Sequence, residues 1–426
     1  MVKFEKITCL RGELEVPTDK SITHRSFILG GMASGSTKVL NPLMSRDTKA
    51  TKRAMEACGV VFEEINNGFL VHSEGFRKFK EPFDVINCDN SGTTARLLTG
   101  VFAPQKKYFV LTGDDSLKRR PMARVINPLS QMGAVIKARD NGRFLPLTVL
   151  PSNMHGSEIK GETKSAQVKS AVILSALQLE EPTIYTETAI TRNHTELMLN
   201  SFGADVRNDG LRIVIEPTDK LYPAEIVVPG DFSSSAFFIG GALMFENSEV
   251  LIKNVGLNPT RTGLLDVLET LGVKFEIDFK NKGADPYGDI FIKSQKLSGG
   301  LIKGDIIANI IDEIPMLSTL GIFASGPLEI RDAQELRVKE SDRISAVVHN
   351  LRNLGADVEE YEDGLKVYPL KDTPKSGKLK SFSDHRIAMI NILLAKRFGN
   401  LEIDEIEVVD VSFPNFVDKI DSITVK

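Results

Sequence analysis

Residues 230–245 read GDFSSSAFFIGGALMF, a short polar opening that leads into an apolar stretch. Such a stretch predicts a helix enclosed by protein, because a helix at the surface keeps one polar face. The same pattern occurs six times in the chain. Its openings lie at 19–21, 90–93, 164–167, 230–233, 311–313 and 383–386. We therefore predict six buried helices, each with a capped N-terminus.

A second pattern lies between the openings and consists of an amphipathic helix, a glycine and a strand. The glycines are 69 to 83 residues apart and are Gly59, Gly133, Gly203, Gly272 and Gly355. A glycine directly after a helix predicts a left-handed C-cap. The two patterns together indicate six repeats of roughly seventy residues that fill the chain.

The repeats predict an α/β fold of two domains, because 426 residues are too many for one core. Three repeats would form each domain, with sheets and second helices around three buried helices. The stretch 217–229 contains three prolines and is the best linker. We expect a first domain at 14–224 and a second domain that combines 1–13 with 225–426.

Composition excludes several classes of partner. A net charge of −4 gives no sign of the basic patch that nucleic-acid binders carry. The longest apolar run, 236–245, is too short to span a bilayer, and the N-terminus lacks a signal-peptide core. Three widely spaced cysteines and six single histidines predict neither disulfides nor a metal site. We expect a cytoplasmic protein that binds neither nucleic acid nor membrane.

Cations stand near the helix openings, although capping does not need them. Positive charge at a helix N-terminus opposes the helix dipole. The cations are Lys20, Arg25, Arg96, Lys164, His385 and Arg386. Ordinary capping explains each opening alone, but together they favour a site where anions lie against helix N-termini. We therefore predict a heavily charged anionic substrate.

Two more clusters have both a functional and a structural explanation. Residues 118–121, KRRP, bring three cations to a proline that could begin a helix, or they form a basic surface loop. Residues 337–343, RVKESDR, would place Lys339 and Arg343 on one helix face with Glu340 paired to Arg343. A salt-bridged exposed helix is the structural alternative.

Two polar groups at predicted helix starts are ambiguous in the same way. Residues 191–196, TRNHTE, contain Arg192 and could be a plain helix entry. Asp312 and Glu313 stand at the mouth of an apolar helix. Asp312 could cap that helix, or it could serve as a general base facing a cationic pocket.

Seven of these motifs, in order, carry a resemblance to a known family. They are DKSxxxR at 19–25, NSGTTxR at 90–96, RRP at 119–121, SAQ at 165–167, IDE at 311–313, RVKESDR at 337–343 and DHR at 384–386. The chain resembles the enolpyruvyl transferases, most closely the EPSP synthases of class II. The resemblance implies two domains of three βαβαββ repeats each, an inside-out α/β barrel with buried parallel helices walled by mixed sheets.

The resemblance also implies small-molecule substrates, shikimate 3-phosphate and phosphoenolpyruvate, in chorismate biosynthesis. The residues implied for shikimate 3-phosphate, mainly in the first domain, are Lys20, Ser21, Arg25, Ser165, Ala166, Gln167, Arg192, Asp312 and Lys339. Those implied for phosphoenolpyruvate are Lys20, Asn90, Gly92, Arg120, Gln167, Arg343 and Arg386. The second domain would supply most of the phosphoenolpyruvate contacts and catalytic groups.

The implied reaction adds the 5-hydroxyl of shikimate 3-phosphate to the enol carbon while the methylene is protonated, and phosphate then leaves. Asp312 would exchange the hydroxyl proton, and Glu340 and Lys20 are candidates for protonating the methylene. The chemistry needs no metal and no organic cofactor. We expect a monomer whose two domains close on the ligand.

Two departures from the family pattern leave questions open. The family often has a lysine two residues before a Phe-Pro pair, where this chain has Val411. This puts a fourth cation for phosphoenolpyruvate in doubt. Gly92 is the residue usual in glyphosate-sensitive members, whereas the SAQVK and RNHTE segments are typical of the weakly binding class. These two indications conflict.

Three alternatives compete with this reading. A sister enzyme that uses a UDP-amino sugar usually has Lys-Asn in place of Lys20-Ser21 and a cysteine in the loop at 113–121, which has none here. A non-catalytic phospho-ligand-binding protein would not require Asp312 and Glu340. An RNA-end-processing enzyme with related repeats would carry a basic surface and a nucleophilic histidine motif.

Overall fold

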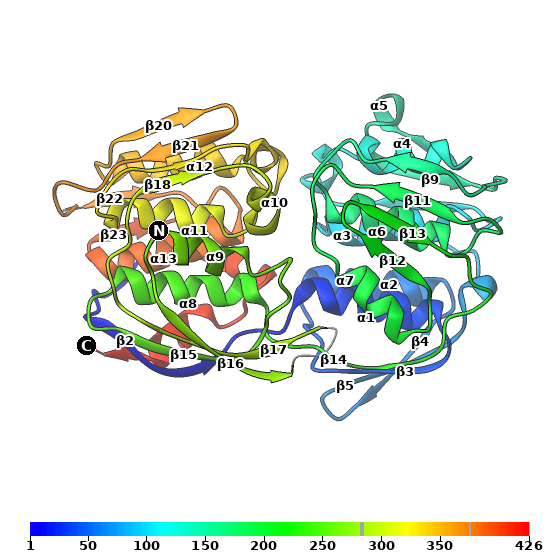
Figure 1. The fold of residues 1–426 in the computed structure, drawn as a ribbon, viewed down its shortest axis with the longest axis horizontal. Coiled ribbons are helices and arrows are strands. Elements are labelled where there is room, and N and C mark those ends of the chain that lie inside the picture. The colour runs from blue at the N-terminus through cyan, green and yellow to red at the C-terminus, as the bar shows by residue number, and fades with distance from the viewer. Residues whose placement is uncertain (282–284, 375, 426) are drawn as a thin grey trace. The chain divides into compact units, whose positions relative to one another are not determined.

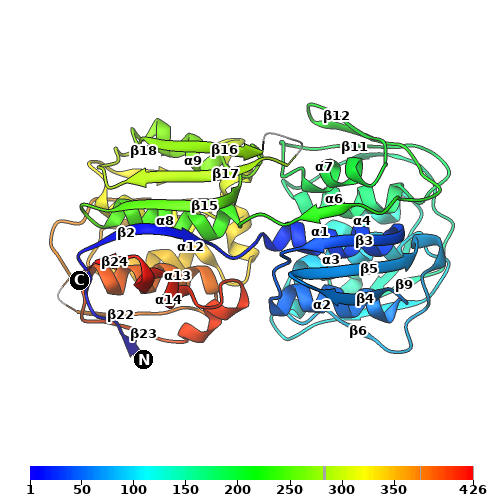
Figure 2. The same ribbon diagram turned by 90° about the horizontal axis from the view of Figure 1, so that it is seen from below.

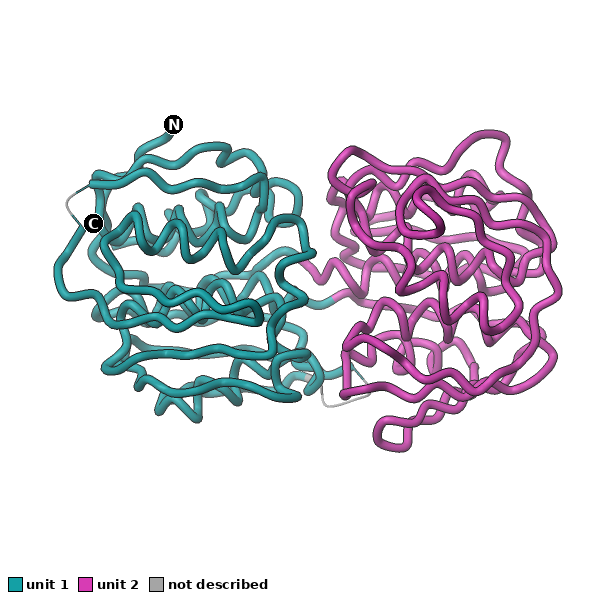
Figure 3. Tube along the Cα trace, turned by 90° about the horizontal axis from the view of Figure 1, so that it is seen from above, with its two compact units in different colours: residues 1–17, 229–426 teal, residues 18–228 magenta. Residues whose placement is uncertain are grey.

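The computed structural model of the protein describes residues 1–281, 285–374 and 376–425. The chain forms two compact units, which Figure 3 distinguishes by colour. Unit 1 combines Met1–Pro17 with Pro229–Lys426, and unit 2 is Thr18–Val228. No described helix is long and apolar enough to cross a membrane.

The unit boundaries lie four residues beyond those expected at 13/14 and 224/225. Strand pairing explains the difference. At the first boundary, β2 (Cys9–Glu15) pairs with β15 (Glu249–Gly256), which keeps the chain up to Pro17 in unit 1. At the second, β14 (Glu225–Val227) pairs with β3 (Ser34–Leu40) and so stays in unit 2.

Unit 2 contains three four-stranded sheets with one shared topology. Their strand orders are β14-β3-β5-β4, β6-β7-β9-β8 and β10-β11-β13-β12. In each sheet the first pair of strands is parallel and the other pairs are antiparallel. The further strands are β4 (Val61–Ile65), β5 (Gly68–Glu74), β6 (Ile86–Asn87), β7 (Phe109–Thr112), β8 (Val135–Ala138), β9 (Phe144–Leu150), β10 (Glu158–Lys160), β11 (Thr183–Thr186), β12 (Val206–Asp209) and β13 (Arg212–Ile215).

Unit 1 keeps this four-stranded topology in one sheet, adds β24 to a second and has three described strands in the third. Its sheets are β16-β17-β15-β2-β24, β18-β19-β21-β20 and β1-β23-β22, so the N-terminal strand β1 takes part in the last sheet. The strands are β1 (Val2–Lys3), β16 (Phe275–Asn281), β17 (Tyr287–Lys293), β18 (Gly300–Ile302), β19 (Leu328–Ile330), β20 (Val358–Tyr361), β21 (Gly364–Val367), β22 (Gly377–Leu379), β23 (Leu401–Ile403) and β24 (Thr424–Val425).

The six predicted helices are buried inside the two units. They are α1 (Lys20–Met32), α3 (Gly92–Phe102) and α6 (Ala166–Ala176) in unit 2, and α8 (Phe232–Met244), α11 (Ile314–Leu320) and α13 (His385–Phe398) in unit 1. Every residue of α8 is buried. Figures 1 and 2 show the sheets outside these helices, and α8, α11 and α13 contact one another. The predicted inside-out arrangement of helices within mixed sheets is confirmed.

The second helices of the repeats cover the buried ones. They are α2 (Arg46–Ala57), α4 (Ala123–Gln131), α7 (His194–Ser201), α9 (Gly263–Thr270) and α12 (Arg343–Asn353). The glycine after each of them has a φ between 80° and 95°, which confirms the five left-handed caps. Short helices complete the chain: α5 (Arg139–Gly142), α10 (Ile306–Ile310), α14 (Phe416–Ser422), and 3-10 turns η1 (Phe76–Lys78), η2 (Leu117–Arg119), η3 (Gly321–Phe323), η4 (Gln334–Val338) and η5 (Ile406–Val411).

The predicted caps are present on four of the six buried helices. Side chains of Asp19, Ser91, Asp231 and Asp384 accept backbone N–H bonds at the starts of α1, α3, α8 and α13. The cap prediction is wrong for α6 and α11. At α11 the chain arrives directly from α10, and Glu313, which precedes the helix, already has helical φ and ψ. Asp312 is therefore not the cap of α11.

Candidate active site

Lys20 begins α1 and is held by a carboxylate of the next helix. Its Nζ lies 3.0 Å from Oδ2 of Asp47, which is in the first turn of α2. The Lys20 side chain keeps 19% of its surface exposed. Ser21, the next residue, is also partly exposed. The start of α1 therefore presents an ammonium group that solvent can reach.

His24 lies fully buried one turn further along α1. Burial lowers its pKa to about 3, and the charges of Lys20 and Arg25 add to this effect against that of Asp47. His24 is thus neutral at physiological pH. Its Nδ1 lies 2.7 Å from Oγ1 of Thr51, which places the ring in a hydrogen-bond chain between α1 and α2.

Arg25 joins three helices through its guanidinium group. Nε donates to Oγ1 of Thr195 at 2.7 Å, and Nη2 donates to Oγ of Ser170 at 3.0 Å. Nη1 donates to the carbonyl oxygen of Ser21 at 3.0 Å. Arg25 is only 4% exposed. It therefore fixes the start of α1 against α6 and α7.

The starts of α3 and α6 are linked by a second set of hydrogen bonds. Arg96 Nη1 donates to Oε1 of Gln167 at 2.7 Å, and Gln167 Nε2 donates to Oγ1 of Thr93 at 3.0 Å. Ser165 and Ala166, beside Gln167, are partly exposed. The structure thus brings the predicted residue Gln167 to the start of α3.

Gly92 and Asn90 allow two arginines to approach the same helix end. Arg120 Nη2 donates to Oδ1 of Asn90. A Cβ at Gly92 would lie 2.8 Å from Nη1 of Arg96 and 3.5 Å from Nη1 of Arg120. Glycine at this position therefore leaves room for two guanidinium groups at the N-terminus of α3. Such a pair beside a helix N-terminus suits an anion.

Arg192 precedes α7, and a buried ion cluster binds the backbone beside it. Lys169 Nζ lies 3.1 Å from Oε2 of Glu187 and 2.8 Å from Oε1 of Glu196. It also donates to the carbonyl oxygen of Thr191 at 3.1 Å. Burial raises the pKa of Glu187, and the charge of Lys169 opposes that rise. The cluster ties down the backbone immediately before Arg192.

Asp312 in unit 1 is surrounded by guanidinium groups. Its Oδ1 lies 3.2 Å from Nη1 of Arg343. Its Oδ2 lies 3.6 Å from Nη1 of Arg261 and 3.9 Å from Nη2 of Arg386. Arg386 Nη1 also donates to the Asp312 carbonyl oxygen at 3.1 Å. The side chain of Asp312 keeps 16% of its surface exposed, so the carboxylate is held but accessible.

Arg343 is the centre of a buried ion network. Besides Asp312, it contacts Oδ2 of Asp384 at 2.8 Å and Oε2 of Glu340 at 2.7 Å. Burial would lower the pKa of Arg343, but the charges of Asp384, Glu340 and Asp312 outweigh it and raise the pKa. Burial would likewise raise the pKa of Asp384, but the charge of Arg343 lowers it.

The prediction that one helix holds both Lys339 and Arg343 is wrong. The 3-10 turn η4 ends at Val338, and α12 begins only at Arg343, capped by Asp342. The predicted i,i+3 contact of Glu340 with Arg343 is present. The alternative of an exposed helix also fails, because Arg343 is 1% exposed. Burial lowers the pKa of Lys339, and the nearby charge of Asp312 opposes this effect.

The two helix starts expected in unit 2 at 118–121 and 191–196 have different outcomes. Pro121 does not begin a helix: α4 starts at Ala123 and its N-cap is Met122, while the cations before Pro121 form η2 and the residue after it. The helix entry expected at 191–196 is present, because α7 begins at His194 with Asn193 as its N-cap.

Sequence reasoning missed Arg261, the buried cation of the fourth repeat. A signal for it existed in the repeat itself. Five repeats carry an arginine 11 to 13 residues before the glycine that follows the second helix, namely Arg46, Arg120, Arg192, Arg261 and Arg343. Three of these had been assigned to the site, so the repeat register alone pointed to Arg261.

The two units thus offer distinct chemistry. Unit 2 presents Lys20 and Gln167 at the starts of α1 and α6 and Arg120 beside the start of α3, groups that suit phosphate and carboxylate. Unit 1 offers a carboxylate, Asp312, fixed among arginines, and a second carboxylate, Glu340, bound to the same Arg343. A positioned carboxylate can accept a proton, and the arginines can stabilise charge on a reacting anion.

Comparisons with known proteins identify the family. A family model described as EPSP synthase (3-phosphoshikimate 1-carboxyvinyltransferase) matches residues 4–420. A 3-phosphoshikimate 1-carboxyvinyltransferase of Bacillus subtilis is 42% identical over 428 residues, which cover all of both chains. That of Petrotoga mobilis is 44% identical over 414 residues, 96% of each chain.

A solved structure agrees with these relatives. The EPSP synthase from Acinetobacter baumannii has a TM-score of 0.86 and 36% identity to the protein, over 100% of this chain and 98% of that one. The match therefore extends over both units and all six repeats. The chain belongs to the EPSP synthase (3-phosphoshikimate 1-carboxyvinyltransferase) family.

Proposed function

We propose that the protein transfers the enolpyruvyl group of phosphoenolpyruvate to the 5-hydroxyl of shikimate 3-phosphate and releases phosphate. The observation that carries this proposal is the carboxylate of Asp312, which contacts Arg343 and Arg386, with Glu340 bound to the same Arg343. A base and an acid near fixed cations are what the addition of a hydroxyl to an anionic enol phosphate requires.

In the first step, the hydroxyl oxygen forms a bond to C2 of phosphoenolpyruvate. Asp312 takes the hydroxyl proton, and C3 gains a proton from Glu340 or Lys20. The electron pair of the C2–C3 double bond forms the new C3–H bond. The product is a tetrahedral adduct that carries the phosphate, the carboxylate and a methyl group. Asp312 suits the base role because its carboxylate is accessible and held in one place.

In the second step, the adduct loses a proton from C3 and the C2–O bond to phosphate breaks. The C2–C3 double bond forms again, now in an enol ether of the shikimate ring. Arg120, Arg343 and Arg386 are the groups we assign to the phosphate and carboxylate of phosphoenolpyruvate. Guanidinium groups suit this role because they bind both anions in a forked geometry.

We propose that unit 2 supplies most contacts to shikimate 3-phosphate. Lys20, Ser21, Arg25 and Arg192, together with the α6 start at 165–167, would bind it, and Asp312 and Lys339 of unit 1 would complete the set. The cation-rich starts of α1 and α6 support this assignment, because helix N-termini and mobile ammonium groups bind phosphate.

An isotope experiment tests the proposed chemistry. The protein is incubated in D₂O with both substrates, and the product is analysed by mass spectrometry. The adduct's methyl group contains a solvent deuteron, so the enol ether should carry deuterium at its methylene carbon. A product formed without any deuterium would contradict the addition–elimination route, and the absence of product would contradict the function.

We also propose that the protein works as a monomer in the cytoplasm. Support comes from its three cysteines, which are buried free thiols, as in a reducing compartment. Burial raises the pKa of Cys58 and of Cys88 to about 12, so neither is a reactive thiolate. Light scattering should give a mass near 46.9 kDa, and a doubled mass would contradict the monomer.

A further inference from the structure

Arg261 is a buried cation that contacts protein carboxylates. It lies between β15 and α9 and is 3% exposed. Its Nη2 donates to Oδ1 of Asp231 at 3.0 Å. Its Nη1 lies 3.6 Å from Oδ2 of Asp312 and 3.9 Å from Oε1 of Glu313. The guanidinium therefore connects the start of α8 with the residues that precede α11.

Arg261 and Arg343 contact different oxygens of the Asp312 carboxylate, Arg343 through a hydrogen bond of 3.2 Å and Arg261 through an ion pair of 3.6 Å. Arg343 contacts Oδ1 of Asp312, and Arg261 lies beside Oδ2. Each arginine is anchored by an aspartate that caps a buried helix. Asp384 caps α13 and lies 2.8 Å from Arg343, whereas Asp231 caps α8 and lies 3.0 Å from Arg261. Each arginine thus joins the aspartate that opens its own repeat to the aspartate that opens the next repeat.

This arrangement bears on proton transfer. A base is efficient when its accepting oxygen is fixed relative to the reacting hydroxyl. Guanidinium groups at both carboxylate oxygens restrict rotation of the carboxylate and favour its anionic form. Because Arg261 is buried and already bound to Asp231, it is suited to holding Asp312 rather than a substrate.

We propose that Arg261 is a positioning residue for Asp312, fixing its carboxylate and keeping it anionic through the anchor Asp231. The inference rests on the proposed function, in which Asp312 accepts the hydroxyl proton. Other charged or titratable groups around Asp312 and its arginines include Arg343, Arg386, Lys339, Glu313, Glu340, Asp384 and His385. A substitution at Arg261 leaves these residues in the sequence, so it tests the charge of Arg261 alone.

The first test measures kcat as a function of pH for two variants. Arg261→Gln removes the positive charge, and Arg261→Lys keeps it. The acid limb of kcat reports protonation of the base in the enzyme–substrate complex. Arg261→Gln should move that limb up by about one pH unit, since it removes a neighbouring cation. It should also lower the plateau about 10- to 100-fold. Arg261→Lys should leave the limb in place. An unshifted limb in active Arg261→Gln would overturn the proposal.

A titration that needs no turnover separates this proposal from the proposed function. Protein labelled with ¹³C at the aspartate carboxyl carbons is titrated by NMR, and the Asp312 signal is the one that Asp312→Asn lacks. Arg261→Gln should raise the pH at which this signal titrates. An unchanged titration would overturn the positioning role even if the protein makes the expected product. A raised titration without any product would contradict the function alone.

Asp231→Asn provides a variant that retains the helix cap, because asparagine caps as well as aspartate. It removes the charge that anchors Arg261 and should lower kcat about tenfold without a matching rise in KM. A wild-type kcat would contradict the role of Asp231 as the anchor of Arg261.

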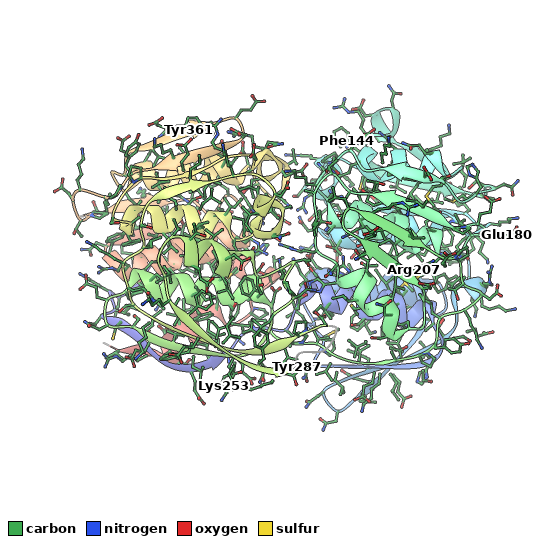
Figure 4. All side chains as sticks on the ribbon, viewed as in Figure 1. Phe144, Glu180, Arg207, Lys253, Tyr287 and Tyr361 are labelled. Atoms are coloured by element: carbon green, nitrogen blue, oxygen red, sulfur yellow. The ribbon has the colours of Figure 1, made fainter. Side chains whose placement is uncertain are left out.

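Arg331→Gln is the matched control, since Arg331 pairs with Asp363 and stacks on Tyr361, which Figure 4 shows at the edge of unit 1. It should leave kcat and its pH profile unchanged.

Discussion

Nη1 of Arg343 and Oδ1 of Asp312 lie 3.2 Å apart, and the arginine in this pair is 1% exposed. The partner carboxylate keeps 16% of its surface exposed. A buried cation thus holds a carboxylate that a substrate can still reach. The cation itself cannot move easily, because Asp384 fixes it from the other side at 2.8 Å. This relationship gives Asp312 a defined orientation before substrate binds.

Asp312→Ala should therefore abolish turnover while substrates still bind. Loss of a general base lowers kcat about 100- to 10,000-fold. The affinity for shikimate 3-phosphate, measured by calorimetry, should change by much less than kcat. Asp266→Ala, at an exposed aspartate of α9, is the matched control and should leave kcat unchanged. If Asp312→Ala retained wild-type turnover, the base would have to be another group.

Gly92→Ala should weaken the use of phosphoenolpyruvate without unfolding the protein. The new Cβ would lie 2.8 Å from Nη1 of Arg96, the end of a flexible side chain, so the guanidinium would shift. We expect KM for phosphoenolpyruvate to rise about tenfold, equivalent to ~1.4 kcal/mol. The KM for shikimate 3-phosphate should stay nearly constant. Gly326→Ala, whose Cβ would meet nothing nearer than 3.8 Å, is the control. An unchanged KM would show that α3 does not bind this substrate.

Lys169→Met should destabilise unit 2 strongly. The substitution leaves Glu187 and Glu196 buried without their cation, and breaking a buried ion pair costs about 3 to 5 kcal/mol. Urea unfolding should show a lower midpoint for this unit. Adding Glu187→Gln and Glu196→Gln should restore most of the lost stability, because no charge is then left uncompensated. A single variant as stable as wild type would contradict the account of this cluster.

The lowered pKa of His24 predicts that the free energy of unfolding falls in acid. Its pKa is about 3 in the folded protein and 6.5 when exposed, so the unfolded chain binds more protons between these values. The free energy of unfolding should thus fall as pH drops from 6.5 towards 3, with His24 contributing about 1.4 kcal/mol per pH unit. His24→Asn removes the titrating group. Its unfolding free energy, measured between pH 6.5 and 4, should show a shallower slope, and equal slopes would contradict the assignment.

The repeat made much of the fold predictable. Buried helices and glycine caps are local features, so the pattern at 230–245 and a glycine such as Gly272 were sufficient to recognise them. Boundaries were harder to predict because they depend on strand pairing. The linker was expected to begin the second domain at residue 225, but β14 pairs with β3, nearly two hundred residues earlier, and stays in unit 2.

The site was predictable where charge and helix start coincide in sequence, as at Lys20. The repeat register pointed to the position of Arg261, but its partners, Asp231 and Asp312, are distant in sequence and only the fold shows these contacts. Residues 337–343 illustrate the opposite problem. Their charges suggested an exposed helix, but the segment contains a 3-10 turn and Arg343 is buried against Asp384 at the start of α13, a contact that local sequence does not reveal.

Release of inorganic phosphate is the most direct test of the central claim. Purified protein is given phosphoenolpyruvate with either shikimate 3-phosphate or a UDP-N-acetylamino sugar, without added metal, and phosphate is followed over time. The account predicts release that depends on shikimate 3-phosphate and is lost in Asp312→Ala. No release with shikimate 3-phosphate, together with turnover of the UDP-sugar, would contradict it.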